Sequence, residues 1–430
     1  MDLLLIYPDY SPDPQLYGDA EGIGEYFWNC EPLSLEYVAS GVRDCCDTVT
    51  LLDLRFQKVD LDRVFADNRP DVVGLTGYSM HVPGIQKLTA QIKSFDPSII
   101  TVIGGIHASL MPEDFFRGDI DFIVRGDGGS GMARILEVLN GGDQHAELPN
   151  IWNKRNGSFA FGETSPLVNP CSLAPPDRTI SSHVFGRFHM GGLSPIALLR
   201  TSAGCPYRCT FCSLWSLMEG KYFVREIENV LEELEQLPTD NVHFVDDEPW
   251  LDASRMGDFA HRILEAGIQK NYLLYARIDT ITDRTEILER WIEAGLKKVV
   301  LGVEAVTEKE LEEYGKKISI AKIEKAYKIL RHLDLDAISL FIIKPTYLQR
   351  DFTRVKRFIE RNKVEFPMFT ILTPLPGTDL LKDDFSGITE MLPNGRPDWY
   401  QWDFQHPVTP TAMGRDAFLH EYVNLRLMNL

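Results

Sequence analysis

The sequence predicts an α/β protein that contains a doubly wound parallel sheet followed by a partial (β/α)6 barrel of the TIM type. The chain has 430 residues and a mass of 48.9 kDa, which exceeds what one hydrophobic core usually supports. Short apolar runs alternate with amphipathic helical segments in two separate stretches. Between these stretches the periodicity is lost, and Pro, Gly, Asn and Ser accumulate. We therefore expect domains at 1–141 and 196–380, a linker at 142–195 and a C-terminal cap at 381–430.

Five buried strands predict the first domain. They are expected at 3–8, 48–55, 71–77, 99–105 and 121–127, with helices near 34–43, 60–68, 83–94 and 129–139. A doubly wound sheet binds ligands at the carboxyl ends of its strands. Three of these ends are rich in Gly and Ser, which let the backbone approach a ligand closely. The candidate contacts there are Tyr78, Ser79, His81, Gly104, Gly105, His107, Gly126 and Gly128.

Six further strands predict the partial barrel. They are expected at 196–200, 242–246, 273–277, 297–302, 337–343 and 368–372, with helices near 222–237, 253–266, 283–294, 307–313, 320–332 and 350–361. The active site of such a barrel lies at the C-terminal ends of its strands. Three cysteines follow the first of these strands, which makes this end of the barrel the expected centre of the chemistry.

Composition narrows the class of protein. The net charge is −19 and the sequence has no basic run, which argues against a nucleic-acid partner and favours a small-molecule substrate. No apolar run reaches the ~18 residues that a membrane span needs. The N-terminal stretch MDLLLIYPDY lacks a basic leader and a cleavage site, so we interpret it as a strand. These features predict a cytoplasmic protein, in which clustered cysteines are metal ligands or catalytic groups.

The three clustered cysteines are Cys205, Cys209 and Cys212, out of seven in the chain. Four cysteine sulfurs would close a structural zinc site or saturate an iron–sulfur cluster. Three sulfurs leave one metal position open for chemistry, and the residues between them offer no acid or histidine as a fourth ligand. The spacing therefore indicates a reactive metal centre, with a structural zinc site as the alternative.

The segment Cys205-Pro-Tyr-Arg-Cys209-Thr-Phe-Cys212 resembles the signature of the radical S-adenosylmethionine (SAM) superfamily. The resemblance implies that the three cysteines hold a four-iron four-sulfur (4Fe-4S) cluster. SAM would chelate the open iron through its amino and carboxylate groups, and its reductive cleavage would yield a 5′-deoxyadenosyl radical. Phe211, just before the last cysteine, belongs to the SAM-binding set that the resemblance implies.

Other strand ends resemble the SAM-binding motifs of the same superfamily. Asp246 and Asp247, after the second strand, are expected to bind the SAM amino group. Arg277, at the third strand end, is expected to reach the SAM carboxylate. Glu304, at the fourth, is expected to accept hydrogen bonds from the ribose. Pro374, after the sixth, lies in a segment that resembles the loop on the adenine side.

The first domain resembles the cobalamin-binding subgroup of this superfamily. The stretch TVIGGIHASLMPEDFF…DIDFIVRGDGG looks like the fourth and fifth strands of that subgroup, so its strand-end candidates become cobalamin contacts. The Asp-x-His-x-x-Gly motif that ligates cobalt from below is absent, because Asp143-Gln144-His145 lacks the glycine and follows the last strand. We predict no histidine below cobalt, with His81 and His107 as hydrogen-bonding loop residues. The subgroup usually has Gly-Glu-Gly-Glu where this chain has Gly126-Asp-Gly-Gly.

The resemblance implies a cobalamin-dependent radical SAM methyltransferase that methylates an unactivated carbon of a natural-product or lipid-type molecule. A reducing partner such as flavodoxin or ferredoxin would supply electrons. The alternatives are a cobalamin radical SAM enzyme that closes a ring or oxidises, an RNA methylthiotransferase and a non-enzymatic metal-binding module. The aromatics of the C-terminal segment either line a substrate pocket or pack a cap; they are Trp399, Tyr400, Trp402 and Phe404. No role is assigned to Cys30, Cys45, Cys46 or Cys171.

Overall fold

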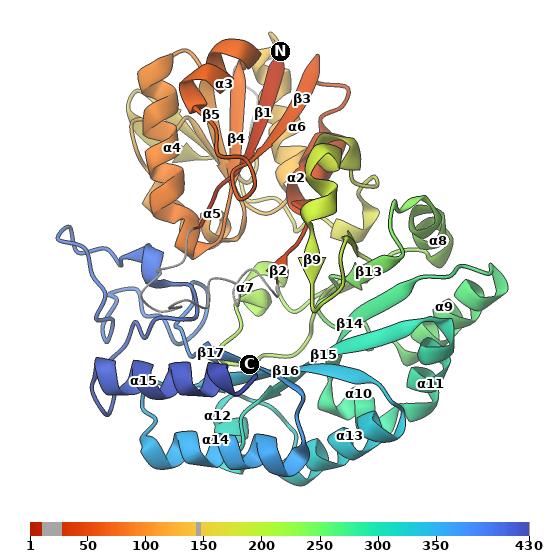
Figure 1. The fold of residues 1–430 in the computed structure, drawn as a ribbon. Coiled ribbons are helices and arrows are strands. Elements are labelled where there is room, and N and C mark those ends of the chain that lie inside the picture. The colour runs from red at the N-terminus through yellow and green to blue at the C-terminus, as the bar shows by residue number, and fades with distance from the viewer. Residues whose placement is uncertain (11–27, 143–147, 430) are drawn as a thin grey trace. The chain divides into compact units, whose positions relative to one another are not determined.

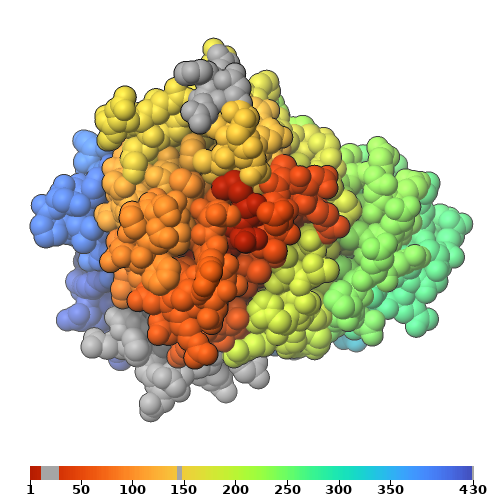
Figure 2. Space-filling model, turned by 90° about the horizontal axis from the view of Figure 1, so that it is seen from above, coloured from red at the N-terminus to blue at the C-terminus, as the bar shows by residue number. Residues whose placement is uncertain are grey.

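The computed structural model describes residues 1–10, 28–142 and 148–429. The chain forms two compact units (Figure 1). The N-terminal unit comprises Met1–Pro12 and Glu31–Arg187, and the C-terminal unit comprises Asp13–Cys30 and Phe188–Leu430. The N-terminus lies at the surface of its unit, where the ammonium group of Met1 pairs with Asp47 (Figure 2). In the described parts of the chain, no helix combines the length and the apolar character that crossing a membrane requires.

A seven-stranded sheet forms the centre of the N-terminal unit, in the order β3-β1-β4-β5-β6-β7-β8. Its first five strands are parallel and confirm the predicted doubly wound sheet. Residues Leu3–Ile6 are buried on both faces, which is why their run is continuously apolar. The strands are β1 (Asp2–Tyr7), β3 (Thr48–Asp53), β4 (Val72–Thr76), β5 (Ile100–Gly104), β6 (Phe122–Val124), β7 (Ile151–Arg155) and β8 (Ser158–Phe161).

Helices cover both faces of this sheet (Figure 1). The helices α2 and α6 pack together so closely that a Cβ on Gly41 would lie 3.0 Å from the Cα of Gly129. The rings of Phe65 and Phe95 join α3 to α4 with centroids 5.5 Å apart. The helices are α2 (Leu33–Gly41), α3 (Leu61–Asn68), α4 (Val82–Phe95), α5 (Ile106–Leu110) and α6 (Gly128–Leu139), with short 3-10 turns at Ser79–His81 and Pro112–Phe115.

The segment predicted as a linker contains structure that its composition does not reveal. The strands β7 and β8 form an antiparallel hairpin that extends the sheet beyond β6. One face of this hairpin is aromatic, and the ring of Trp152 lies 4.9 Å from that of Phe116. The segment continues through 3-10 turns at Pro170–Ser172 and Arg178–Arg187, still within the N-terminal unit.

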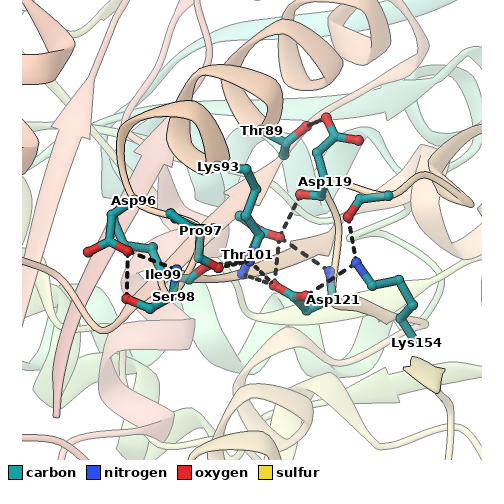
Figure 3. Close-up of polar contacts among 11 residues, drawn as sticks. Thr89, Lys93, Asp96, Pro97, Ser98, Ile99, Thr101, Asp119, Asp121 and Lys154 are labelled. Atoms are coloured by element: carbon teal, nitrogen blue, oxygen red, sulfur yellow. Dashed lines mark hydrogen bonds and ion pairs between the residues drawn. The ribbon is translucent and has the colours of Figure 1, made fainter. Parts of the chain in front are cut away.

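A half-buried ionic network lies at the amino end of β5 and β6 (Figure 3). The Asp121 carboxylate accepts a hydrogen bond from the Thr101 amide (2.9 Å) and pairs with Lys93 (2.6 Å) and Lys154 (3.5 Å). Burial alone would raise the pKa of Asp121, but the hydrogen bonds from Lys93 and Thr101 and the charge of Lys154 lower it below its ordinary value.

We expect Asp121→Asn to lower the free energy of unfolding of the N-terminal unit by about 1–3 kcal/mol, because hydrogen bonds to a charged group are lost. A lowered pKa in the folded state stabilises the fold fully above the ordinary pKa of aspartate, and that stability is lost as the pH falls through the folded-state value. Urea unfolding between pH 3 and pH 7 measures both effects. Asp67→Asn, whose exposed partner Arg63 is 3.6 Å away, is the control and should change stability little.

The C-terminal unit contains a six-stranded parallel sheet in the order β10-β13-β14-β15-β16-β17, as predicted for a partial barrel. Its strands are β10 (Ile196–Leu199), β13 (Asn241–Phe244), β14 (Asn271–Arg277), β15 (Leu296–Glu304), β16 (Asp336–Ile343) and β17 (Phe366–Ile371). Each strand follows its neighbour in the chain, so the carboxyl ends form one continuous edge. A separate pair, β2 (Trp28–Asn29) and β9 (His189–Met190), is antiparallel.

Helices line the outer side of this sheet, except for the short helix that directly follows the cysteine loop (Figure 1). A cluster of rings from Phe244, Phe259 and Trp291 packs between the sheet and this layer, with centroids 5.4–5.8 Å apart. The helices are α7 (Leu214–Met218), α8 (Ile227–Gln236), α9 (Ala253–Glu265), α10 (Ile278–Asp283), α11 (Thr285–Ala294), α12 (Glu308–Glu313), α13 (Ile320–His332) and α14 (Gln349–Asn362).

Two local expectations for this unit are wrong. The helix predicted near 222–237 begins only at Ile227, because Tyr222–Val224 form strand β12, which pairs with β11 (Ser202–Gly204). The short helix α10 directly after β14 was not expected. The strand β12 arises because pairing with β11 overrides the local helical pattern.

The C-terminal segment packs against the barrel. Trp399 and Trp402 are buried, and Trp402 Nε1 donates to the Pro374 carbonyl (2.7 Å). The helix α15 (Arg415–Arg426) follows, and the Tyr422 hydroxyl donates to the carbonyl of Phe369 in β17 (2.8 Å). Of the two interpretations that the sequence left open, the buried tryptophans favour a packed cap.

Candidate active site

The three clustered cysteines lie in the loop between β11 and α7. All three are half-buried, and the Cys212 amide donates to the Cys209 carbonyl (3.1 Å). Thr210 anchors the loop to the segment after α12, since its amide donates to Tyr314 O (3.3 Å) and its hydroxyl to Glu313 O (3.1 Å). The fold therefore shapes this loop through contacts outside the cysteines themselves.

Burial keeps the thiols of the loop protonated while no metal is bound. Burial raises the pKa of Cys205 to about 11 and raises that of Cys212, and a charge on Cys209 adds to both shifts. Binding of a metal to Cys205 and Cys212 would therefore release protons. No group of three Cys, His, Asp or Glu side chains among the described residues is placed to hold a single metal ion. The sulfurs of a cluster each bind a different iron, so they need not converge on one point.

The acidic residues after β13 divide into buried and accessible groups. Asp246 is fully buried, and its carboxylate accepts hydrogen bonds from the Thr201 amide (2.7 Å) and the Thr201 hydroxyl. Burial raises the pKa of Asp246. Asp247 is exposed and accepts from the Gly204 amide, one residue before Cys205 (2.7 Å). Asp246 is therefore bonded to the residue directly before β11, whereas Asp247 is bonded to the residue directly before Cys205.

Glu248 and Arg277 meet beside the cysteine loop. Arg277 Nε lies 3.8 Å from Glu248 Oε2 and 3.0 Å from Asp279 Oδ1, and its guanidinium lies over the Tyr207 ring at 3.8 Å. Burial raises the pKa of Glu248 to about 7, although Arg277 opposes the shift. A cavity of about 630 Å³ opens here between these residues and the helices α10 and α11. The Arg277 prediction thus falls on a cavity wall, and Glu248 was not singled out from the sequence.

Glu304 ends β15 in a left-handed conformation (φ 67°) and is nearly buried. Its Oε1 accepts a hydrogen bond from Lys316 Nζ (2.9 Å). Lys316 Nζ also lies 6.0 Å from the centre of the Phe211 ring, which contacts the Tyr314 ring edge-on. The structure therefore brings Glu304 and Phe211 together through Lys316, a residue that sequence reasoning missed. Pro374 is buried under the cap and offers its carbonyl to Trp402.

In the N-terminal unit, the carboxyl ends of β4 and β5 contain two buried histidines. His81 Nδ1 accepts from the Tyr78 amide (3.0 Å), and burial, with a contribution from Arg55, lowers the pKa of His81 to about 4. His107 contacts Ser79 Oγ through Nδ1 and Asp114 Oδ2 through Nε2, both at 3.0 Å. Both ring nitrogens of His107 are therefore occupied within the protein, and the triad joins the loops after β4 and β5.

The glycines at these strand ends lie in two kinds of surroundings: some are closely packed and others face open space. A Cβ on Gly105 would lie 2.6 Å from Thr76 Oγ1, and one on Gly128 would lie 3.0 Å from Val38, so these glycines permit close packing. Nothing lies within 4 Å of a Cβ placed on Gly104 or Gly126, so both face open space. The exposed side chains of Tyr78 and Ile106 border this edge. Ile106 was not predicted, although it stands beside two predicted glycines.

Other sequence expectations fall outside these two edges. The Asp143-Gln144-His145 motif lies outside the described residues, so the prediction about the lower face of cobalt stays a prediction. Cys30, Cys45, Cys46 and Cys171 are half-buried and form no disulfide. Cys45 and Cys46 pack against the apolar core of the N-terminal unit.

Two family models match the chain. The B12 binding domain matches residues 24–136, and the radical SAM superfamily matches residues 199–382. These matches fall on the parallel sheet of the N-terminal unit and on the partial barrel with its cysteine loop.

Named proteins are similar to nearly the whole of this chain. The hopanoid C-3 methylase of Methylococcus capsulatus is 28% identical over 96% of this chain and 78% of that protein. The anaerobic magnesium-protoporphyrin IX monomethyl ester cyclase of Rubrivivax gelatinosus is 23% identical over 97% of this chain and 75% of that protein. The solved structure of the cobalamin-dependent SAM radical enzyme OxsB, with aqua-cobalamin and SAM bound, has a TM-score of 0.73 at 17% identity and covers 99% of this chain and 66% of that chain. The chain therefore combines a match to the B12 binding domain with a match to the radical SAM superfamily, in this order.

Proposed function

We propose that this chain is a cobalamin-dependent radical SAM methyltransferase that methylates an unactivated carbon of a small natural-product or lipid-type molecule. The observation that carries the proposal is the loop of three half-buried cysteines beside a cavity at the carboxyl edge of the barrel. When bound, the cluster supplies the electron that cleaves SAM, and cobalamin supplies the methyl group. The protein supplies binding, orientation and exclusion of water.

In this proposal the residues of the barrel edge bind SAM. Cys205, Cys209 and Cys212 hold the cluster, which leaves one iron for SAM. Glu248 and Asp247 provide carboxylates for the SAM ammonium group, and an ammonium beside Glu248 would stabilise its charged form. Arg277, on the wall of the same cavity, is suited to the SAM carboxylate.

The remaining residues predicted to contact SAM have different proposed roles. Glu304 and Phe211 face the ribose and adenine side. Asp246 acts as a positioning residue through Thr201, since its oxygens are already bonded. Pro374 contributes the backbone of the loop after β17.

The carboxyl edge of the N-terminal sheet is proposed to bind cobalamin. Open space at Gly104 and Gly126, bordered by exposed Tyr78 and Ile106, suits a large ring with apolar faces. Ser79, His81 and His107 shape the loops of this edge, while Gly105 and Gly128 let neighbouring segments pack closely.

Gly104→Leu should fold normally, because nothing lies within 4 Å of its new Cβ, and should weaken cobalamin binding at least about tenfold, or ~1.4 kcal/mol. The visible absorbance that stays with the protein after gel filtration measures the binding. Gly118→Leu is the matched control, since it also faces open space but lies in the loop before β6. Equal cobalamin uptake by Gly104→Leu and wild type would show that the ring binds elsewhere.

We also propose a reducing partner such as flavodoxin or ferredoxin and a cytoplasmic location. Cleavage of SAM requires an electron from outside the chain, and the three thiols must be reduced to take up iron. Reduced thiols are the rule in the cytoplasm.

A second candidate function is ring closure or oxidation without methyl transfer. Similarity to the anaerobic cyclase over 97% of this chain favours it. The two functions differ in products, since methylation forms S-adenosylhomocysteine together with 5′-deoxyadenosine. The deciding experiment is anaerobic reconstitution with iron, sulfide and cobalamin, followed by chromatography of both nucleosides during turnover with candidate lipids. Formation of 5′-deoxyadenosine and a product without S-adenosylhomocysteine would favour ring closure or oxidation, and absence of iron would exclude both.

A further inference from the structure

A buried ion pair joins the end of β15 to the segment after α12. The side chains of Glu304 and Lys316 are 11% and 7% exposed, and their charged atoms are 2.9 Å apart. A buried charge is costly unless it is paired, so the two residues are expected to be held in place by each other.

The surroundings of the pair restrict its position further. A Cβ on Gly302 would lie 2.7 Å from Glu304 Oε1 and 3.3 Å from Lys316 Nζ, so the pair fills the space beside this glycine. The register of β15 against β16 shifts between Gly302 and Glu304, which accompanies the left-handed conformation of Glu304. An irregular strand end therefore directs the carboxylate toward Lys316.

The ammonium group of Lys316 lies close to the cysteine loop. Its Nζ lies 6.0 Å from the centre of the ring of Phe211, the residue directly before Cys212. Burial would lower the pKa of Lys316, but the charge of Glu304 raises it. The segment of Lys316 is also tied to the loop, because a Cβ on Gly315 would lie 3.2 Å from Arg208 O. Lys316 is thus a cation beside the part of the loop that contains Cys209, Phe211 and Cys212, and Glu304 is its counter-ion.

We propose that Lys316 sets the reduction potential of the proposed cluster, by stabilising the negative charge that the cluster gains when it accepts an electron. This inference rests on the proposed cluster function. Charges close to an iron–sulfur site change its potential, and burial strengthens the effect because little water screens it. Glu304 holds the ammonium in place and partly offsets its charge.

The test is an anaerobic redox titration of the reconstituted, SAM-free protein, followed by electron paramagnetic resonance. Lys316→Met should shift the midpoint potential to a more negative value, since a positive charge is lost. Glu304→Gln should shift it to a more positive value, since the counter-ion is lost. The double variant should lie between the two single variants, and Lys316→Arg should stay near wild type. A merely structural role predicts no such dependence on the sign of the charge.

The control is Lys309→Met on α12, whose side chain is 86% exposed and should leave the potential unchanged. Shifts of the same sign in both single variants, or none, would overturn the inference. If Lys316→Met takes up no iron, the double variant is compared with Glu304→Gln, because these two proteins differ only at Lys316. A more negative midpoint potential in the double variant supports the proposal. Equal midpoint potentials contradict it. Iron and sulfide analysis of the wild type separately tests the cluster itself.

Discussion

Cys209→Ala is expected to lose its iron and sulfide and all reductive cleavage of SAM. Cys209 is the middle of the three cysteines in the loop. Two sulfurs leave two irons of the cluster without a protein ligand, and the loop contains no histidine or acid to replace the third. Anaerobic reconstitution, iron and sulfide analysis and assay of 5′-deoxyadenosine measure the loss.

Cys171→Ala provides the control for this variant. Cys171 is also half-buried but lies in the N-terminal unit, outside the cysteine loop. It should bind iron and cleave SAM as the wild type does. Wild-type iron content in Cys209→Ala would contradict the proposed ligand set.

Gly204→Ala should prevent cluster assembly although it alters no ligand. Gly204 precedes Cys205 and has a φ of +91°, and a Cβ there would lie 2.1 Å from the Lys221 carbonyl oxygen. The side chain would force β11 and β12 apart at the base of the loop and would add backbone strain of about 1–3 kcal/mol. We expect a lowered melting temperature and an iron content well below that of the wild type.

Gly295→Ala tests whether strain alone causes this loss. Gly295 has a φ of +117°, and its Cβ would also lie 2.1 Å from a backbone oxygen, that of Lys270, before β15 begins. Calorimetry should show destabilisation of both variants, whereas only Gly204→Ala should lose iron while still folded. Equal iron loss in both would mean that general instability, not the shape of the loop, is responsible.

Sequence periodicity predicted the two parallel sheets because their strands are buried and therefore continuously apolar. It did not predict the hairpin β7–β8, since an antiparallel edge strand such as Ser158–Phe161 alternates and has no long apolar run. The start of α8 was misplaced because Tyr222–Val224 pair with a strand that is distant in the chain.

The candidate site was predictable where one short segment carries the signal, as the cysteine spacing does. The roles of neighbouring acidic residues were harder to predict, because sequence alone does not tell which of Asp246 and Glu248 faces the cavity. His107 finds its partners Ser79 and Asp114 in separate segments, and Lys316 meets Glu304 across the helix α12. Such pairings depend on the folded chain and leave no local pattern.

The hydrogen bonds that anchor the cysteine loop bear on how the protein recovers after exposure to oxygen. Asp246 accepts a hydrogen bond from Thr201, Asp247 accepts one from Gly204, and Thr210 donates one to Glu313. These bonds join protein groups only, so loss of the proposed cluster to oxygen would not break them. We therefore expect fresh iron, sulfide and a thiol reductant to restore the proposed cluster without unfolding of the chain.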